Sequence, residues 1–528
     1  MKFKHILSVL LLFCVTAAFA NRINILEAGG KNDGKFKNTA AIKKAIETLS
    51  RKGGGTLYFP AGTYLTGPIV MKCNITLYVE AGATLLFSDN FEDYLPYVEM
   101  RYEGVVMKSF CPLIYAYGQE NIAIIGRGKL DGQGKKWWYE LFRTEGEVDK
   151  YGALKNVDKF NKLWDKENAG LPEQMAPDYK RVIARRFFRP PFIQPYKCKN
   201  VLIEGVTVTN SPFWTINPEF CENVTIHAVN VINKPSPNTD GINPESCKNV
   251  RISDCHISVG DDCITLKSGR DEQARKIGVP CENITITNCT MENGHGGVVI
   301  GSEMSGDVRK VTISNCVFDG TDRGVRIKSM RGRGGKVEDI RIDNIVMNNI
   351  KKEAITVNLV YDDTKPEPVS EKTPIFRNIH ISNLTGTKVN MACTVIGLDE
   401  MPISNLTFNN INIEGKTGFE FTMAKDIELN NINVGVEMGA PFKLKNVENV
   451  MLTNVKTSTP NATTPVIKIT DSKDVLMQSC YPVGGSKSFL QLEGAKSTGI
   501  ILSNNSLDRL MNKVEYGTGV KATSIIIR

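Results

Sequence analysis

Short stretches in which apolar and polar residues alternate recur along most of the chain. Four of them read "CKNVLIEGVTV" from residue 198, "CENVTIHAVNV" from 221, "CKNVRISDCHI" from 247 and "CENITITNCTM" from 281. An alternation with a period of two is typical of a β-strand with one buried face. Related stretches continue towards the C-terminus, and most successive units begin 21 to 29 residues apart.

The repeat predicts the fold class. The first apolar strand positions of the twelve units are Val201, Val224, Val250, Ile284, Val311, Ile340, Ile379, Leu406, Ile427, Val450, Val475 and Ile500. A strand-rich repeat of this length predicts an all-β solenoid, a right-handed parallel β-helix whose rungs stack about 4.8 Å apart. A propeller would need a longer repeat with four strands per blade, and a helical solenoid would need a period of 3.6 residues.

The repeat also predicts the domain organisation. We expect a single β-helix domain over residues 21–528, with an N-terminal cap at about 22–90. Within the cap, residues 37–51 have the apolar spacing of a short amphipathic helix. Residues 138–190 are charged, contain tryptophans and break the pattern, so they are an expected insertion and a candidate wall of a binding face.

The N-terminus and the net charge bear on location and partners. Residues 1–20 have two lysines, an apolar run and Ala18-Phe19-Ala20, which predicts a secretory signal peptide and export to a periplasm or the medium. No other segment reaches the roughly 20 apolar residues of a membrane span. The formal charge of +8 suits a polyanionic substrate, although many soluble surfaces carry as much. We expect a monomer and no nucleic-acid partner.

The cysteines fall into columns of the repeat. Four of them lie three residues before the aligned strand position, and four lie five residues after it, where other units have Ile, Leu or Val. A position shared by Cys and Leu indicates a buried apolar site, so we expect core thiols rather than a metal cluster. Disulfides between neighbouring rungs stay open. The Asn-x-Thr sequence at Asn223 is interpreted as a turn asparagine rather than a glycan site.

Three aspartates lie close together in "SPNTDGIN" (236–243) and "SVGDDCITLKSG" (258–269). Asp261 follows Asp240 by 21 residues, about one turn of the coil. If residues 268–279 loop out, His295 lies one turn beyond Asp262, and Arg326 lies one turn beyond His295. The spacing therefore predicts that these side chains stack on one outer face of the solenoid.

This set of side chains suits glycoside hydrolysis. Close carboxylates cannot all ionise, so one has a raised pKa and can act as an acid, while another activates water. Strand alternation puts Arg326 and Lys328 on one face, where they can bind a sugar carboxylate, and turns Ile327 into the core. His295 lies between glycines, which permits close approach of a substrate.

"NTDG", "GDDC", "GHGG" and "RIK", in this order, resemble the polygalacturonase family of pectin-degrading glycoside hydrolases, family 28. "DGKFKNTAAIKKAIE", "GGGTLYFPAGTY" and "NSPFWTINP" are also similar to that family. The resemblance implies inverting hydrolysis of α-1,4-galacturonosidic bonds without a metal or other cofactor. It implies that Asp261 is the general acid, that Asp240 and Asp262 hold and deprotonate the attacking water, and that His295 tunes the acid.

The resemblance also implies substrate-binding residues. Asn238 would orient the pair of water-binding aspartates, and Arg326 and Lys328 would bind the galacturonate carboxylate. Tyr361 in "NLVY" would line the leaving-group side. "IGSEMSG" (300–306) is more similar to the bacterial exo-acting branch than to fungal endo-acting enzymes, which implies a groove closed at one end.

Three alternatives stay open. A hydrolase of a decorated pectin, such as rhamnogalacturonan or xylogalacturonan, would use the same aspartates with different subsites. A calcium-dependent pectate lyase would use Arg326 or Lys328 as its base and the aspartates as calcium ligands. A non-catalytic carbohydrate-binding solenoid would keep the repeat but would not need the three aspartates.

Overall fold

The structure is a computed structural model that describes residues 21–138, 158–172, 183, 186–362, 365–482, 484–510 and 512–528. The predicted signal peptide (1–20) and much of the predicted insertion (138–190) lie outside the described residues. None of the helices in the described segments is long and apolar enough to cross a membrane.

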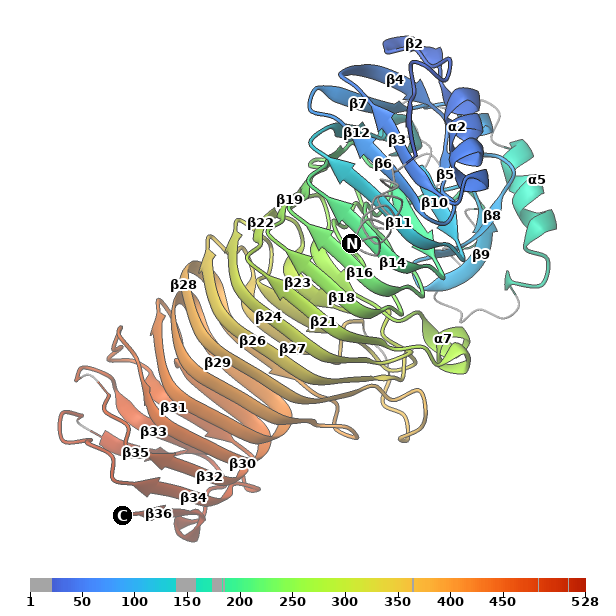
Figure 1. The fold of residues 1–528 in the computed structure, drawn as a ribbon. Helices are drawn as coiled ribbons and strands as arrows, with labels where there is room; N and C mark the ends of the chain where they lie inside the picture. The colour runs from blue at the N-terminus through green and yellow to red at the C-terminus, as the bar shows by residue number, and fades with distance from the viewer. Residues whose placement is uncertain are drawn as a thin grey trace, which may run out of the picture.

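The chain coils into a parallel β-helix, and its strands stack along one long axis from the blue N-terminal end to the red C-terminal end (Figure 1). The predicted fold class is confirmed. Parallel pairings between successive rungs form three rows of strands along the solenoid, called the first, second and third sheets.

The first sheet contains the strand that begins each aligned unit. Its members are β1 (Arg22–Asn24), β3 (Gly55–Phe59), β6 (Ile75–Val79), β11 (Glu120–Gly126), β14 (Lys199–Glu204), β16 (Glu222–His227), β18 (Lys248–Ser253), β21 (Cys281–Thr287), β24 (Val308–Asp319), β26 (Lys336–Asn348), β28 (Ile375–Ile396), β29 (Ile403–Val436), β30 (Phe442–Lys456), β32 (Lys473–Gln478), β34 (Thr498–Ser503) and β36 (Ile525–Ile527).

The second sheet merges with the first from β24 onwards. Its separate strands are β2 (Asp33–Lys37), β4 (Gly62–Thr66), β7 (Ala83–Phe87), β12 (Lys129–Asp131), β15 (Thr207–Thr209), β17 (Asn230–Ile232), β19 (His256–Val259) and β22 (Thr290–Asn293).

The third sheet carries the predicted site residues. Its strands are β5 (Ile69–Val70), β10 (Ile114–Tyr117), β13 (Ile193–Tyr196), β20 (Asp262–Leu266), β23 (Gly296–Ile300), β25 (Val325–Lys328), β27 (Glu353–Asn358), β31 (Pro465–Thr470), β33 (Ser488–Glu493) and β35 (Asn512–Tyr516), with the end of β28, the middle of β29 and the start of β30 between β27 and β31. Isolated bridges at Ile216 and Ile242 continue this sheet from β13 to β20.

Alternation within each strand builds the core. In β16, Val224 and Ile226 are buried and Thr225 between them is half-buried. Val224 pairs in register with Val201 on the preceding rung and Val250 on the next, so like side chains stack. One apolar cluster therefore runs through the inside of the solenoid.

Asparagines stack at the turn that enters the first sheet. Asn223 has a φ of 58°, in the left-handed region that Asn tolerates better than other side chains. Its Nδ2 donates to Oδ1 of Asn200 at 3.1 Å, and Nδ2 of Asn249 donates to Oδ1 of Asn223 at 3.1 Å. The interpretation of Asn223 as a turn asparagine is confirmed.

The cysteine columns are part of the core. The thiols of Cys198, Cys221 and Cys247 lie on successive rungs, and the backbone N–H of each of the first two donates to the sulfur of the next at 3.4 Å. Every cysteine in the described ranges is a free thiol. The prediction of core thiols is confirmed for these columns.

Helix α2 (Thr39–Arg51) covers the N-terminal rungs, as predicted (Figure 1). The predicted apolar residues Ile42, Ala45, Ile46 and Leu49 are its buried face. Asn38 precedes the helix, but its side-chain amide donates to backbone carbonyls of the neighbouring segments instead of capping the helix.

An antiparallel hairpin leaves the solenoid ahead of the regular rungs. It consists of β8 (Val98–Tyr102) and β9 (Val105–Ser109), and helix α5 (Asp158–Glu167) packs beside it. Trp137 and Trp164, which border and belong to the predicted insertion, are both buried. Helix α7 (Asp271–Ile277) lies in the segment that we expected to loop out, and it projects from the side of the stack (Figure 1).

Candidate active site

The third sheet brings the predicted carboxylates together. The backbone N–H of Gly241 donates to Asp262 O at 3.0 Å, and that of His295 donates to Asp261 O at 2.9 Å. Asp240 and Asp262 therefore lie on adjacent rungs, as do Asp261 and His295. The predicted stacking of these four residues is confirmed.

The predicted register of Arg326 is wrong. Arg326 pairs with Val299, four residues further along the chain than His295. One turn of the coil here is 27 residues, from Val299 to Arg326, four fewer than the 31 residues that separate His295 from Arg326. The Arg326 side chain nevertheless reaches back to the aspartates across Gly296, which pairs with Asp262 and has no side chain to separate them.

Asp262 is held by both predicted cations. Lys328 Nζ lies 2.9 Å from Asp262 Oδ2, and Arg326 Nη1 lies 3.5 Å from Oδ1. Burial alone would raise the pKa of Asp262, but Lys328, Arg326 and Lys267 outweigh it, so the pKa is lowered and the carboxylate is ionised. Ile327 between the cations is buried in the core, as strand alternation predicted.

Asp240 is the carboxyl with the raised pKa. Only 2% of the residue is exposed, and burial together with the charge of Asp261 raises its pKa well above the ordinary value. Its Oδ2 accepts from Asn243 Nδ2 at 2.9 Å and from Thr265 Oγ1 at 3.4 Å. Of this adjacent pair, Asp262 therefore keeps its charge to lower pH, and Asp240 more readily holds a proton.

Asp261 faces the cleft in contact with His295. His295 Nδ1 lies 3.1 Å from Asp261 Oδ1, and their side chains are 52% and 20% exposed, far more than Asp240 or Asp262. The hydrogen bond to Asp261 raises the pKa of His295 against the effect of its partial burial. The pair is thus a proton-carrying unit at the surface of the cluster.

The cleft above these residues encloses about 260 Å³. Its described lining consists of Glu103, Trp214, Asn238, Asp240, Asp261, Asp262, Lys267, Arg270, Ser302, Glu303, Lys328, Arg333 and Tyr361. The Tyr361 ring lies 5.5 Å from the Arg326 guanidinium and 5.3 Å from Lys328 Nζ, so it is at the site as expected. Asn238 donates to Glu103 Oε1 at 3.2 Å rather than to either aspartate.

Sequence reasoning missed a second set of charges in this cleft. Lys267 Nζ lies 2.7 Å from Glu303 Oε2 and 3.9 Å from Asp240 Oδ2, with almost no exposure. Arg270 Nη1 lies 3.6 Å from Glu303 Oε1. Lys267 and Arg270 flank "SG" at 268–269, and alternation from the core residues Ile264 and Leu266 could have placed Lys267 on the outer face.

Sequence reasoning also missed the side-chain amide of Asn243, which holds Asp240. Gln194, Asn217 and Asn243 stack on successive rungs: Gln194 Nε2 donates to Asn217 Oδ1 at 2.9 Å, and Asn217 Nδ2 donates to Asn243 O at 2.9 Å. The repeated "INPE" at 216–219 and 242–245 was the signal for this buried column. Asn243 at its end orients the Asp240 carboxyl.

The hairpin β8–β9 is fastened beside the cleft. Arg101 is fully buried, with Nη1 3.4 Å from Glu219 Oε2 and 3.5 Å from Glu245 Oε1. The hairpin turn brings Glu103 into the cleft, and Gly104 O accepts from Arg270 N–H at 3.1 Å. The predicted wall at 138–190 lies partly outside the described residues, and it is this hairpin that the structure shows at the cleft.

Comparison with known proteins identifies the family. The profile described as glycosyl hydrolases family 28 matches residues 185–438, which include every predicted site residue. A probable polygalacturonase of Vitis vinifera is 30% identical over 406 residues, covering 75% of this chain and 74% of the relative. The chain belongs to glycosyl hydrolase family 28. It is therefore a glycoside hydrolase, as the motifs indicated.

Other members of family 28 align over most of the chain. An exo-poly-alpha-D-galacturonosidase of Dickeya chrysanthemi is 29% identical over 470 residues, covering 84% of this chain and 76% of the relative. The crystal structure of an exopolygalacturonase from Thermotoga maritima superposes with a TM-score of 0.67 at 37% identity, covering 75% of this chain and 87% of that one. A rhamnogalacturonase A/epimerase, pectate lyase-like profile matches residues 22–100.

Proposed function

We propose that this family 28 enzyme is a secreted exo-polygalacturonase that hydrolyses α-1,4-galacturonosidic bonds of pectin with inversion. The observation that carries the proposal is the cluster of Asp240, Asp261 and Asp262, bordered by Arg326 and Lys328, in a cleft that Glu103 of the β8–β9 hairpin turn helps to line. The exo-acting relatives support the substrate and the mode of action.

Asp261 is the general acid in this proposal because it is the most exposed of the three carboxyls and can reach a leaving oxygen. Asp262 is ionised and Asp240 lies on the adjacent rung, so the two can hold a water between them, and Asp262 or Asp240 accepts its proton. Breaking the glycosidic bond moves the Asp261 proton to the leaving oxygen, while the water oxygen bonds to the anomeric carbon.

The raised pKa of Asp240 suits the end of an inverting cycle. Such a turnover leaves the acid deprotonated and the base protonated, so a proton must return to Asp261 before the next cycle. His295, with its raised pKa and its 3.1 Å contact with Asp261, is the group that delivers it.

In the complex with substrate, Arg326 and Lys328 bind a second partner besides Asp262. A guanidinium has five N–H donors, and one nitrogen of Arg326 faces Asp262, so the others can bind the galacturonate carboxylate. Tyr361 packs over both cations and borders the leaving-group side. We assign the orientation of Asp240 to Asn243 and keep Asn238 as a substrate contact next to Glu103.

Product analysis on polygalacturonate tests this function. We expect saturated galacturonic acid as the main product from the first turnovers, with a slow loss of viscosity. Asp261→Asn is expected to lower kcat by about 10³-fold or more, as for loss of a general acid, whereas Asp254→Asn, on an exposed turn, retains activity. Unsaturated products would indicate a lyase, mixed oligomers an endo-acting enzyme, and activity confined to branched pectins a hydrolase of decorated substrates.

A further inference from the structure

A second groove lies on the outer edge of the solenoid, towards the C-terminus from the catalytic cleft. It encloses about 620 Å³. Its described lining is Asn349, Ile350, Lys351, Lys388, Val389, Asn390, Glu414, Gly415, Lys416, Gly435, Val436, Glu437 and Thr459. Because these residues come from consecutive rungs, the groove runs along the solenoid axis.

The groove continues the row of turns that holds His295. Backbone N–H groups of Asp322, Lys352 and Met391 donate to Gly294 O, Asp322 O and Lys352 O at 2.9, 2.7 and 2.9 Å. This stack of turns leads from the Asp261–His295 contact directly to the groove. The groove begins three rungs beyond Asp261, roughly 14 Å at about 4.8 Å per rung.

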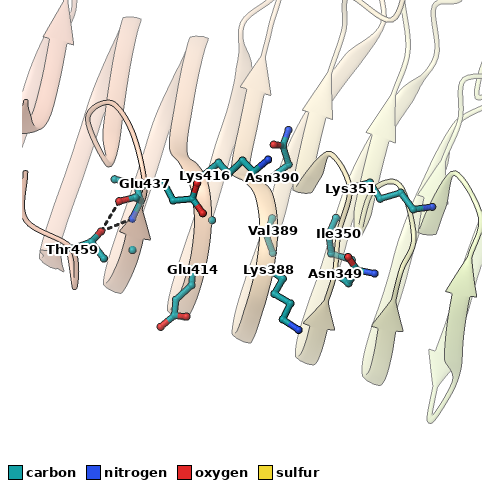
Figure 2. A pocket seen from close by; sticks show the side chains of 13 residues that line it. Asn349, Ile350, Lys351, Lys388, Val389, Asn390, Glu414, Lys416, Glu437 and Thr459 are labelled. Carbon is teal, nitrogen blue, oxygen red and sulfur yellow. Dashed lines mark hydrogen bonds between the residues drawn. The ribbon is translucent and has the colours of Figure 1, made fainter.

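The two rims of the groove are polar and its floor is apolar. Figure 2 shows Lys351, Asn390, Lys416 and Glu437 along one rim, and Asn349, Lys388 and Glu414 along the other. The buried side chains of Ile350, Val389 and Val436 lie in the floor. Thr459 closes the C-terminal end, where its Oγ1 accepts from Val436 N–H at 2.6 Å and donates to Val436 O at 2.8 Å (Figure 2).

Two cations of the groove are unpaired. Lys351, by contrast, is paired, because its Nζ lies 3.4 Å from Oδ1 of Asp322. Asp322 lies on the rung after His295. Lys388 and Lys416 are exposed, and within the described part of the chain neither makes an ion pair. An ammonium group on a flexible stem binds anions without a fixed geometry, which suits a chain that must move along the surface.

We propose that this groove binds the part of an anionic galacturonan chain that extends beyond the catalytic cleft. The inference rests on the proposed function, because that function places a polymer with a carboxylate on each sugar three rungs away. Lys388 and Lys416 pair with those carboxylates, and the asparagines and glutamates of the rims hydrogen-bond to hydroxyl groups. The apolar floor packs against the carbon faces of the sugar rings.

Kinetics on a long and a short substrate test the proposal. We expect Lys388→Ala/Lys416→Ala to raise KM for long polygalacturonate about five- to tenfold, as for the loss of two exposed charge contacts. The kcat of this variant on polygalacturonate should stay unchanged. Its kcat and KM for trigalacturonate should also stay unchanged, because trigalacturonate is too short to reach the groove. Lys425→Ala/Lys473→Ala is the matched control, since these lysines are also exposed and unpaired in the described ranges but lie outside the groove.

Binding to the Asp261→Asn protein separates this inference from the proposed function. In that background, the double Lys388/Lys416 variant should weaken binding of polygalacturonate, and added salt should weaken the parent in the same way. An unchanged polymer KM and affinity, or an equal loss with polymer and trigalacturonate, overturns the inference. If the parent does not hydrolyse trigalacturonate, the proposed function is wrong. The binding of polygalacturonate to the Asp261→Asn proteins then still tests the groove.

Discussion

The three aspartates differ because their surroundings differ. Asp262 keeps its charge beside Lys328 and Arg326, whereas Asp240, buried on the adjacent rung, has a raised pKa. Asp261 is paired with a histidine at the open side of the cleft. A reaction that gives one proton and takes another needs carboxyls whose surroundings differ in this way.

The pH dependence of activity follows from His295. Its pKa is raised above the ordinary 6.5 by Asp261, so the protonated form persists below that raised value and is lost as the pH rises through it. We expect kcat/KM to fall along an alkaline limb above pH 6.5. In His295→Gln the fall should occur at lower pH, with kcat reduced about 10²-fold.

The measurement is a pH profile of kcat/KM for the parent, His295→Gln and a control, His227→Gln. His227 ends strand β16, with its Nδ1 3.3 Å from Asp254 Oδ2, and it does not line the cleft, so its loss should leave the profile unchanged. An alkaline limb at the same pH in the His295 variant would show that another group carries this proton.

Whether a site residue could be predicted from the sequence depended on whether a short motif contained that residue together with its partner. The aspartates, His295 and the two cations could be predicted from four short motifs. Asn243 was missed because its role depends on a buried column that no single motif reveals. Glu103 was missed because the sequence gives no spacing between a hairpin turn and a rung more than 130 residues later.

The strands owe their register to the turns as much as to the core. Asn200, Asn223 and Asn249 each adopt a positive φ and pass a side-chain hydrogen bond to the next rung. Stacked aliphatic side chains therefore fix the register of a rung inside the solenoid, and stacked asparagine amides fix it at the outer surface. The repeat predicted both, because it spaces the asparagines at the rung period.

Substitution of Asn223 separates these contributions. Asn223→Ala loses two ladder hydrogen bonds and strains a left-handed backbone, so we expect the free energy of unfolding to fall by about 2 kcal/mol. Asn223→Gly loses the same hydrogen bonds but tolerates the backbone, so we expect about half that loss. Urea denaturation of the full chain measures both, and equal losses would contradict a backbone contribution.

The whole molecule combines a regular scaffold with an irregular wall. The period predicted a dozen rungs, their stacking and the thiol columns, since each depends only on the repeat. The β8–β9 hairpin has no period, and its anchor joins Arg101 to Glu219 and Glu245, which are distant in sequence. The contact of this hairpin with the cleft could therefore be recognised only in three dimensions.

In the proposed mechanism, the aspartate cluster hydrolyses a galacturonosidic bond by direct attack of water. Proton NMR of the first product released from an α-1,4-linked galacturonan tests it most directly, before the product mutarotates. We predict saturated galacturonic acid in the β-anomeric form. An initial α-anomer would mean a retaining mechanism, and an unsaturated sugar would mean elimination; either result would contradict the roles assigned to Asp240, Asp261 and Asp262.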